Sequence, residues 1–90
     1  MHDPAAATDD SLIAAASRGD EAAFARLVQR HSSRALAVAT RFLGSPSEAE
    51  EVVQEAFWRA WRGTARWRPG EAAFSTWLHR VVINLCSDRE

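Results

Sequence analysis

The segment PSEAEEVVQEAFWRAWRG, which runs from Pro46 to Gly63, carries the strongest structural signal in the sequence. Its apolar residues recur every three or four positions, the spacing that places them on one buried face of an α-helix. These residues are Ala49, Val52, Val53, Ala56, Phe57, Ala60 and Trp61. Ser45 or Ser47 can cap the start of the helix, and Gly63 ends the pattern. The segment therefore predicts an amphipathic helix over residues 46–63.

The face opposite this apolar stripe is polar, with one exception. Its residues are Glu51, Gln54, Glu55, Trp58 and Arg62. Trp58 is a large indole at a position where the helical period predicts exposure to water, and exposed indoles are typical anchors for a partner. The glutamates of this helix have no histidine beside them and lie toward its N-terminus. That placement favours a solvated face that compensates the helix dipole over a metal site or an acid–base pair.

Three further helices are expected on either side of this segment. They cover about residues 10–18, 21–43 and 71–89. Residues 1–8 contain no cap and no large side chain to bury, so we expect a disordered tail there. The predicted fold is all-α, a compact bundle of about four helices.

Short polar signals mark the ends of the first two helices. Asp9, Asp10 and Ser11 can supply the cap and the favourable first-turn charge of the first helix. Gly19 ends that helix, and Asp20 is well placed to cap the next one. The chain therefore turns sharply between the two helices.

His31 and Cys86 are reactive residue types that we assign to structure. His31 lies on the apolar stripe of the second helix, and no second histidine or cysteine accompanies it. We therefore expect a residue at the edge of the core with one satisfied ring nitrogen, in preference to a ligand or a proton carrier. Cys86 is the only cysteine, lies in an apolar helical run and is expected to contribute packing.

Length and composition restrict the function classes. A chain of 90 residues with 47% apolar residues and a net charge of −1 fits one small domain with a modest core. No P-loop, nucleophile elbow, dinucleotide-binding turn, HExxH helix or calcium loop occurs, so we expect neither an enzyme nor a cofactor. There is no signal peptide and no apolar run of membrane-spanning length, which predicts a cytoplasmic protein without direct membrane insertion.

The near-neutral total conceals a division of charge along the chain. Residues 1–55 carry five Arg against nine Asp and Glu, whereas residues 56–90 carry six Arg against three acids. A balanced charge normally argues against a nucleic-acid partner, because phosphate binding leaves a basic footprint. Here the C-terminal part by itself has that footprint.

Tryptophans accompany the basic part of the chain. Trp58, Trp67 and Trp77 lie on faces or in loops that the core does not clearly include, and Trp67 lies in the loop GTARWRPG between residues 63 and 70. Indoles interleaved with Arg are typical of proteins that hold single-stranded nucleic acid. Two structural alternatives stay open: Trp67 can fold back as a lid over the core, and Trp77 can belong to the core.

Four residues of the last helix form a stripe beside its apolar face. They are Ala73, Trp77, Arg80 and Asn84. An aromatic ring, a cation and an amide in line suit base stacking, phosphate contact and base-edge hydrogen bonding, respectively. The stripe continues the basic loop, which favours a nucleic-acid interface.

Three strings together resemble a known family. They are RGDEAAFARLVQRH from Arg18, SEAEEVVQEAFWRAWR from Ser47 and RWRPGEAAFSTWLHRVVIN from Arg66. The chain from about Asp9 to Arg89 is similar to region 2 of the extracytoplasmic-function (ECF) group of bacterial sigma factors, which belong to the sigma-70 family. The resemblance implies a transcription initiation domain that binds core RNA polymerase and recognises and melts the promoter −10 element by trapping non-template bases.

The resemblance also implies which residues meet each partner. The polymerase-binding positions, which would dock on the clamp helices of the β′ subunit, are Glu51, Gln54, Glu55 and Trp58. The positions for single-stranded promoter DNA are Arg66, Trp67, Arg68, Gly70, Glu71, Ala72, Ala73, Phe74, Trp77, Arg80 and Asn84. Region 4, the part of such factors that reads the −35 element, is absent, and the chain ends in CSDRE without a helix stop signal, so we expect a domain excised from a longer protein.

A second hypothesis needs no DNA. In this alternative the chain is a helical protein-interaction module that an anti-sigma protein sequesters through the same acidic and apolar faces. Such a partner would also hold the domain near the inner membrane. Binding of single-stranded DNA separates the two hypotheses.

Overall fold

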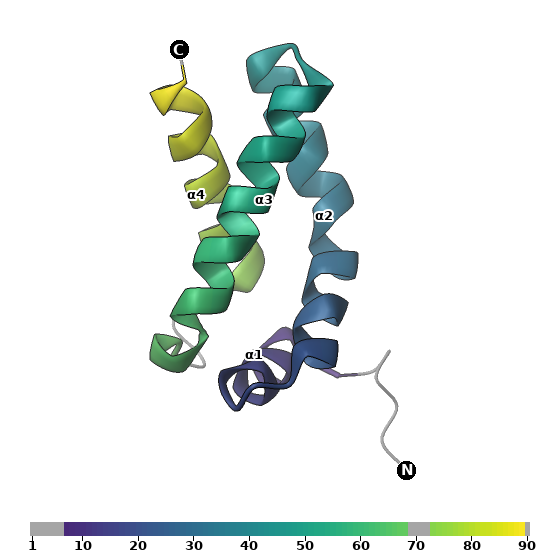
Figure 1. The fold of residues 1–90 in the computed structure, drawn as a ribbon, viewed down its shortest axis with the longest axis vertical. Coiled ribbons are helices and arrows are strands. Elements are labelled where there is room, and N and C mark those ends of the chain that lie inside the picture. The colour runs from purple at the N-terminus through teal and green to yellow at the C-terminus, as the bar shows by residue number, and fades with distance from the viewer. Residues whose placement is uncertain (1–6, 69–72, 90) are drawn as a thin grey trace.

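The computed structural model describes residues 7–68 and 73–89. Figure 1 shows an all-helical arrangement, and no strand occurs in these two ranges. The helices are α1 (Asp9–Ser17), α2 (Glu21–Leu43), α3 (Pro46–Gly63) and α4 (Phe74–Asp88), with a short 3₁₀ turn, η2 (Thr64–Arg66), after α3. The all-α bundle expected from the sequence is confirmed.

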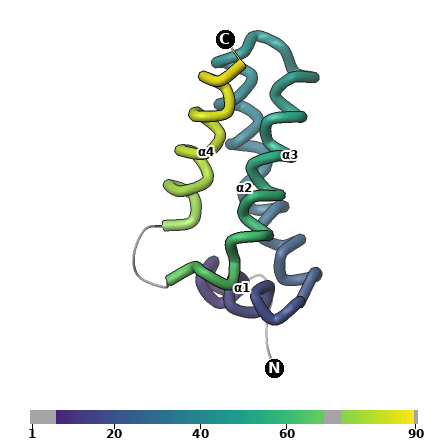
Figure 2. The backbone as a smooth tube through the Cα atoms, turned by 60° about the vertical axis from the view of Figure 1, so that its left-hand side comes forward, coloured from purple at the N-terminus to yellow at the C-terminus, as the bar shows by residue number. Residues whose placement is uncertain are grey.

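Three of the helices run along the long axis of the molecule, and the first closes one end. In Figure 1, α2 and α3 form an antiparallel pair, and α4 returns beside them in the direction of α2. Figure 2 shows α1 across the end at which α3 stops, and α1 contacts η2 there. The extents are 44 × 23 × 20 Å. The N-terminal helix therefore lies beside the segment that leads from α3 to α4.

Local signals explain where the first two helices begin and end. α1 begins one residue earlier than predicted, because Thr8 is its cap: the Thr8 hydroxyl accepts a hydrogen bond from the Ser11 amide at 3.1 Å. The prediction that Asp9, Asp10 or Ser11 would cap this helix was therefore wrong, and Thr8 does not belong to a tail. Asp20 caps α2 as predicted, through a 3.1 Å bond from the Ala23 amide.

The turn between α2 and α3 joins two matched end signals. Gly44 has a left-handed backbone with φ of +70°, and its amide donates to the carbonyl of Thr40 at 2.8 Å. Ser45 then accepts from the Glu48 amide, and Pro46 occupies the first turn of α3. These two signals bring the apolar faces of α2 and α3 together.

The core is built from the apolar stripes of all four helices. The side chains that are least exposed and largest are Leu27, Val52, Leu78, Val82 and Cys86. The stripe predicted for α3 is buried from Ala49 to Ala60, and Trp61 at its end is half-buried. Cys86 is fully buried, as expected for a packing residue. Within the described residues no helix is both long and apolar enough to cross a membrane.

The last helix begins later than predicted. Its first residue is Phe74, because Ala73 adopts an extended backbone with ψ of 142° and makes no side-chain cap. Phe74 is 3% exposed, so the helix starts where the first aromatic side chain enters the core. Residues 69–72, where the helix was expected to begin, and residues 1–6 of the expected tail lie outside the described residues.

Two glycines provide a matched test of the backbone. An added Cβ would meet no atom within 4 Å at Gly44 or at Gly63, but only Gly44 has a positive φ, since φ of Gly63 is −94°. Gly44→Ala is expected to lower the free energy of unfolding by about 1 kcal/mol, because L residues are strained in the left-handed region. Gly63→Ala is expected to raise it by about 0.5 kcal/mol, because alanine restricts the unfolded chain. Urea unfolding of both variants measures the difference, and equal effects would contradict the assignment.

Candidate nucleic-acid interface

An aromatic cluster joins the segment after α3 to the start of α4. The Trp67 ring centroid lies 5.9 Å from that of Phe74 and 6.1 Å from that of Trp77, both in edge contacts. Phe74 and Trp77 are 6.0 Å apart. Trp67 and Trp77 are half-buried and pack against the core. The structure therefore supports the alternative in which Trp67 folds back over the core, with part of its ring left accessible.

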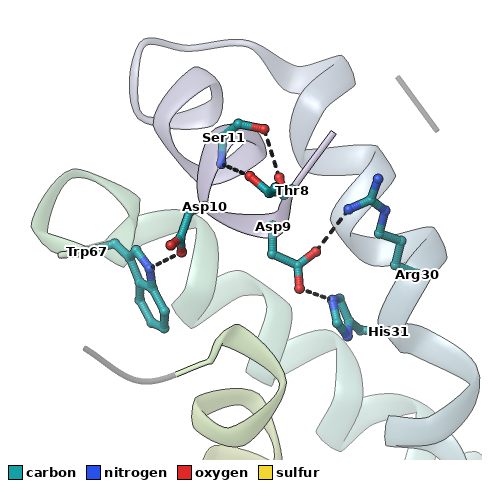
Figure 3. A network of polar contacts seen from close by, with 7 residues as sticks. All are labelled: Thr8, Asp9, Asp10, Ser11, Arg30, His31 and Trp67. Carbon is teal, nitrogen blue, oxygen red and sulfur yellow. Dashed lines mark hydrogen bonds and ion pairs between the residues drawn. The ribbon is translucent and has the colours of Figure 1, made fainter. Parts of the chain in front are cut away.

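The indole nitrogen of Trp67 has a specific partner. Its Nε1–H donates to Oδ1 of Asp10 at 3.2 Å, across 57 positions of sequence (Figure 3). A half-buried indole N–H needs an acceptor, and a carboxylate is a strong one. Sequence reasoning missed this contact because no local pattern connects the first turn of α1 to a loop near residue 67.

The neighbouring acid, Asp9, contacts α2 on the side of α1 that faces away from Trp67. Its Oδ2 lies 2.8 Å from Nε2 of His31, and its Oδ1 accepts from Nη1 of Arg30 at 3.2 Å (Figure 3). The His31 ring also lies 5.1 Å from that of Phe74. His31 is therefore the core-edge residue with one satisfied nitrogen that the sequence predicted, and it adjoins the aromatic cluster.

A cavity of about 310 Å³ lies beside this cluster. Ile13 from α1 lines it, together with Arg66, Trp67 and Arg68 from the segment after α3 and Trp77 from α4. Both arginines are exposed. The site thus combines apolar rings with two guanidinium groups, a composition that suits a flat, uncharged ring joined to a phosphate.

The predicted stripe of α4 lies on an accessible face. Ala73, Arg80 and Asn84 are exposed, and Trp77 is half-buried between them. Of the other residues predicted to bind DNA, Phe74 is buried and lines the cavity from the core side. Gly70, Glu71 and Ala72 lie outside the described residues. The described positions therefore combine a cavity at the end of α3 with the exposed side chains of Arg80 and Asn84 along α4.

The face predicted to bind RNA polymerase is separate from this cluster. Glu51, Gln54 and Glu55 are exposed, and Trp58 is 55% exposed. Gln54 and Trp58 line a groove of about 350 Å³ between α2 and α3, whose floor contains Phe24 and Phe57. Trp58 is therefore the exposed indole that the helical period predicted, set at the edge of an apolar groove.

Two surface ion pairs on this face were not predicted. Nη1 of Arg89 lies 3.1 Å from Oε2 of Glu51, and Nε of Arg59 lies 3.5 Å from Oε2 of Glu55. Both pairs are well exposed, so each contributes about 1 kcal/mol or less to stability. Glu51 and Glu55, two of the residues predicted to bind RNA polymerase, are thus already paired within the chain. Among the described residues no group of three or more His, Cys, Asp or Glu side chains is arranged to hold a metal ion.

A known protein family accounts for most of this architecture. The family model described as Sigma-70 region 2 matches residues 27–89, which include most of α2, all of α3 and α4, and the aromatic cluster. The chain belongs to the Sigma-70 region 2 family. The match begins inside α2, so α1 and its two acids lie outside it.

Named relatives of this domain include several ECF sigma factors. The chain is 41% identical to the RNA polymerase sigma-H factor of Pseudomonas aeruginosa, over 84% of this chain and 39% of that protein. It is 38% identical to the ECF sigma-E factor of Escherichia coli K12, over 86% of this chain and 39% of the relative. It is also 38% identical to the ECF sigma factor SigM of Mycobacterium tuberculosis, over 91% of this chain and 41% of that protein. The chain spans about two fifths of the length of these relatives.

A solved structure shares this fold over most of the chain. It is the NMR structure of an engineered region 2 of sigmaE in complex with GTAAAA. The TM-score is 0.81 at 32% sequence identity, and the match covers 92% of this chain and 85% of that one. The ECF sigma region 2 resemblance read from the sequence is confirmed.

Two adjacent aromatic residues of α3 test whether Trp58 serves the fold. Phe57 is 7% exposed and Trp58 is 55% exposed. Phe57→Ala is expected to lower the free energy of unfolding by about 3 kcal/mol or more, because it opens a cavity in the core. Trp58→Ala is expected to change it by about 1 kcal/mol or less. Urea unfolding followed by circular dichroism measures both, and a large loss on Trp58→Ala would assign that indole to the fold.

Proposed function

We propose that this Sigma-70 region 2 domain recognises the promoter −10 element as single-stranded DNA and binds core RNA polymerase. The observation that carries the proposal is its likeness to the structure of an engineered region 2 of sigmaE in complex with GTAAAA. The accessible face of the aromatic cluster and α4 provides the groups that such a ligand needs. The near-neutral charge of the chain is compatible with it, because six of the eleven arginines lie after residue 55.

On the DNA side, the residues divide the contacts between phosphate and base. Arg66, Arg68 and Arg80 are exposed cations that suit phosphate oxygens. The partly accessible rings of Trp67 and Trp77 suit stacking, and the Asn84 amide can accept from and donate to a base edge. We assign general affinity to the arginines and sequence preference to the rings and the amide.

Such a domain opens DNA by binding energy alone. Unstacking a base costs a few kcal/mol, and stacking on an aromatic side chain returns about 1–3 kcal/mol per base. Phosphate contacts and the polymerase supply the remainder. The unpaired strand is then captured as it forms, which needs neither a covalent intermediate nor nucleotide hydrolysis.

Two substitutions on α4 separate these contributions. Arg80→Ala is expected to weaken binding of GTAAAA and of a scrambled hexamer by the same factor, and to reduce the slope of log affinity against log salt by about 0.7. Asn84→Ala is expected to weaken only GTAAAA, by about fivefold or more, because a base contact is lost. Fluorescence anisotropy with labelled hexamers at several salt concentrations measures both effects.

The control for charge is Arg41→Ala, which removes an exposed arginine from the last turn of α2. It should leave both hexamer affinities and the salt slope close to those of the unsubstituted domain. If the unsubstituted domain binds both hexamers equally, and Arg80→Ala and Asn84→Ala change nothing, the DNA-recognition proposal is wrong. That result would favour the protein-interaction alternative.

On the polymerase side, the exposed face of α3 offers acids around one apolar anchor. We propose that Glu51, Gln54, Glu55 and Trp58 contact the clamp helices of the β′ subunit. The groove beside Trp58 supports this assignment, because an exposed indole at an apolar groove is typical of a central contact in an interface. Formation of the complex would release Glu51 from Arg89 and Glu55 from Arg59.

Charge reversal on this face tests the polymerase contact. Glu55→Arg is expected to weaken binding of a β′ clamp-helix fragment by about tenfold or more, because it brings like charges together in the interface. Asp88→Arg is the matched control, since it makes the same change of charge at an exposed position on α4. Biolayer interferometry with the immobilised fragment gives both affinities. Equal affinities for the two variants would move the polymerase contact to another face.

An anti-sigma protein is the alternative partner for the same face. The apolar groove continues along α2 and α3 past Val28, Leu36 and Val53, with a second volume of about 420 Å³. An amphipathic helix laid along this groove would bury Trp58 and compete with polymerase. In this arrangement sequestration and polymerase binding exclude one another.

A further inference from the structure

The orientation of Trp67 is determined on two sides. One side of the indole meets the rings of Phe74 and Trp77 in edge contacts at centroid distances of 5.9 and 6.1 Å. The other side is held by the 3.2 Å hydrogen bond from Nε1 to Oδ1 of Asp10. An indole has a single donor, so this bond uses the whole hydrogen-bonding capacity of the side chain. Trp67 therefore presents an apolar wall whose one donor is already bonded to Asp10.

Asp10 is itself held in place by its neighbours in α1. Thr8 caps this helix, and Asp9 binds Arg30 and His31 of α2 at 3.2 and 2.8 Å. Figure 3 shows the two adjacent carboxylates directed to opposite sides, Asp9 toward α2 and Asp10 toward Trp67. The first turn of α1 thus connects α2 to the aromatic cluster. A carboxylate on an anchored helix turn restricts the orientation of its hydrogen-bond partner more than a carboxylate on a flexible segment does.

Helix α1 contributes to the cavity in two ways. Ile13, which is 2% exposed, lines the cavity of about 310 Å³, and Trp67, which Asp10 holds, is part of its wall. The family match begins at residue 27, so Ile13 and Asp10 both lie outside the matched segment, whereas Trp67 lies inside it. The geometry of the candidate DNA site therefore depends on a helix that carries none of the predicted DNA-binding residues.

We propose that Asp10 is a positioning residue for recognition of the −10 strand, acting through the indole of Trp67. By fixing the ring plane, it shapes the cavity wall against which an unstacked base is held. This inference rests on the proposed DNA-binding function. A negative charge this close to the site opposes a polyanion, so charge and positioning predict opposite effects when Asp10 is changed.

Two substitutions of Asp10 separate positioning from charge. Asp10→Asn removes the charge and keeps an oxygen acceptor for the indole, whereas Asp10→Ala removes both. The measured quantity is the ratio of the affinities for GTAAAA and for a scrambled hexamer of the same composition. Asp10→Ala is expected to lower this ratio about five- to tenfold, and Asp10→Asn is expected to restore it to within about twofold of the unsubstituted domain. If charge alone acts, the two variants behave alike and the inference is overturned.

A double-mutant cycle tests whether Asp10 acts through Trp67. Trp67→Phe keeps an aromatic ring and removes the indole donor, so Asp10→Ala should have no further effect on the ratio in that background. Additive effects of the two substitutions would overturn the inference. If Asp10→Ala does not fold, Trp67→Phe alone still tests the inference. An affinity ratio that stays unchanged when the indole N–H is lost would contradict a positioning role for Asp10.

A direct readout accompanies the affinities. The indole N–H resonance of Trp67, assigned by its loss in Trp67→Phe, should move on Asp10→Ala and stay near its original position on Asp10→Asn. Failure of the inference and failure of the proposed function give different results. An unsubstituted domain that prefers GTAAAA and an Asp10→Ala variant with the same preference reject positioning alone. An unsubstituted domain with no preference rejects both.

Discussion

Burial of the apolar face of α3 is the constraint on which the rest of the structure depends. Ala49, Val52, Val53 and Ala56 are 0–5% exposed, and α2 and α4 both pack against this helix. Alanines at the contact allow the helix axes to approach closely, which a 90-residue chain needs to exclude water from a small core. Because one face of α3 is fully occupied, its other face is left for Trp58 and the acids around it. The division between the buried core and the proposed partner surface thus lies within one helix.

Much of the fold could be predicted from the sequence because the deciding signals are local. Helical periodicity, Gly44 with its left-handed backbone, and the caps Asp20 and Ser45 act over fewer than five residues, and the limits of α2 and α3 agree with the structure. The start of α4 was harder to predict, because it depends on where Phe74 enters the core and not on a capping residue. Periodicity also located the exposed indole of α3 correctly.

The candidate site was only partly predictable, since its organising contacts are distant in sequence. The bond from Trp67 to Asp10 spans 57 positions, that of Arg89 to Glu51 spans 38, and that of His31 to Asp9 spans 22. No periodic pattern encodes such pairs, which arise when helices meet at particular angles. The sequence therefore identified the aromatic and charged residues of the site, but it predicted Trp67 mainly as an exposed side chain that contacts a ligand. Its partner on α1 was visible only as a helix-start acid.

The long separation between Asp10 and Trp67 also governs the order in which the structure can be completed during synthesis. Domains begin to fold from the N-terminus as the ribosome releases them, at about 5–20 residues per second. α1 and α2 can pair early, through Asp9 and His31, but Asp10 cannot form its bond until Trp67, 57 positions later, has emerged. The contact between α1 and the aromatic cluster therefore forms only after α1 and α2 are both available to pair.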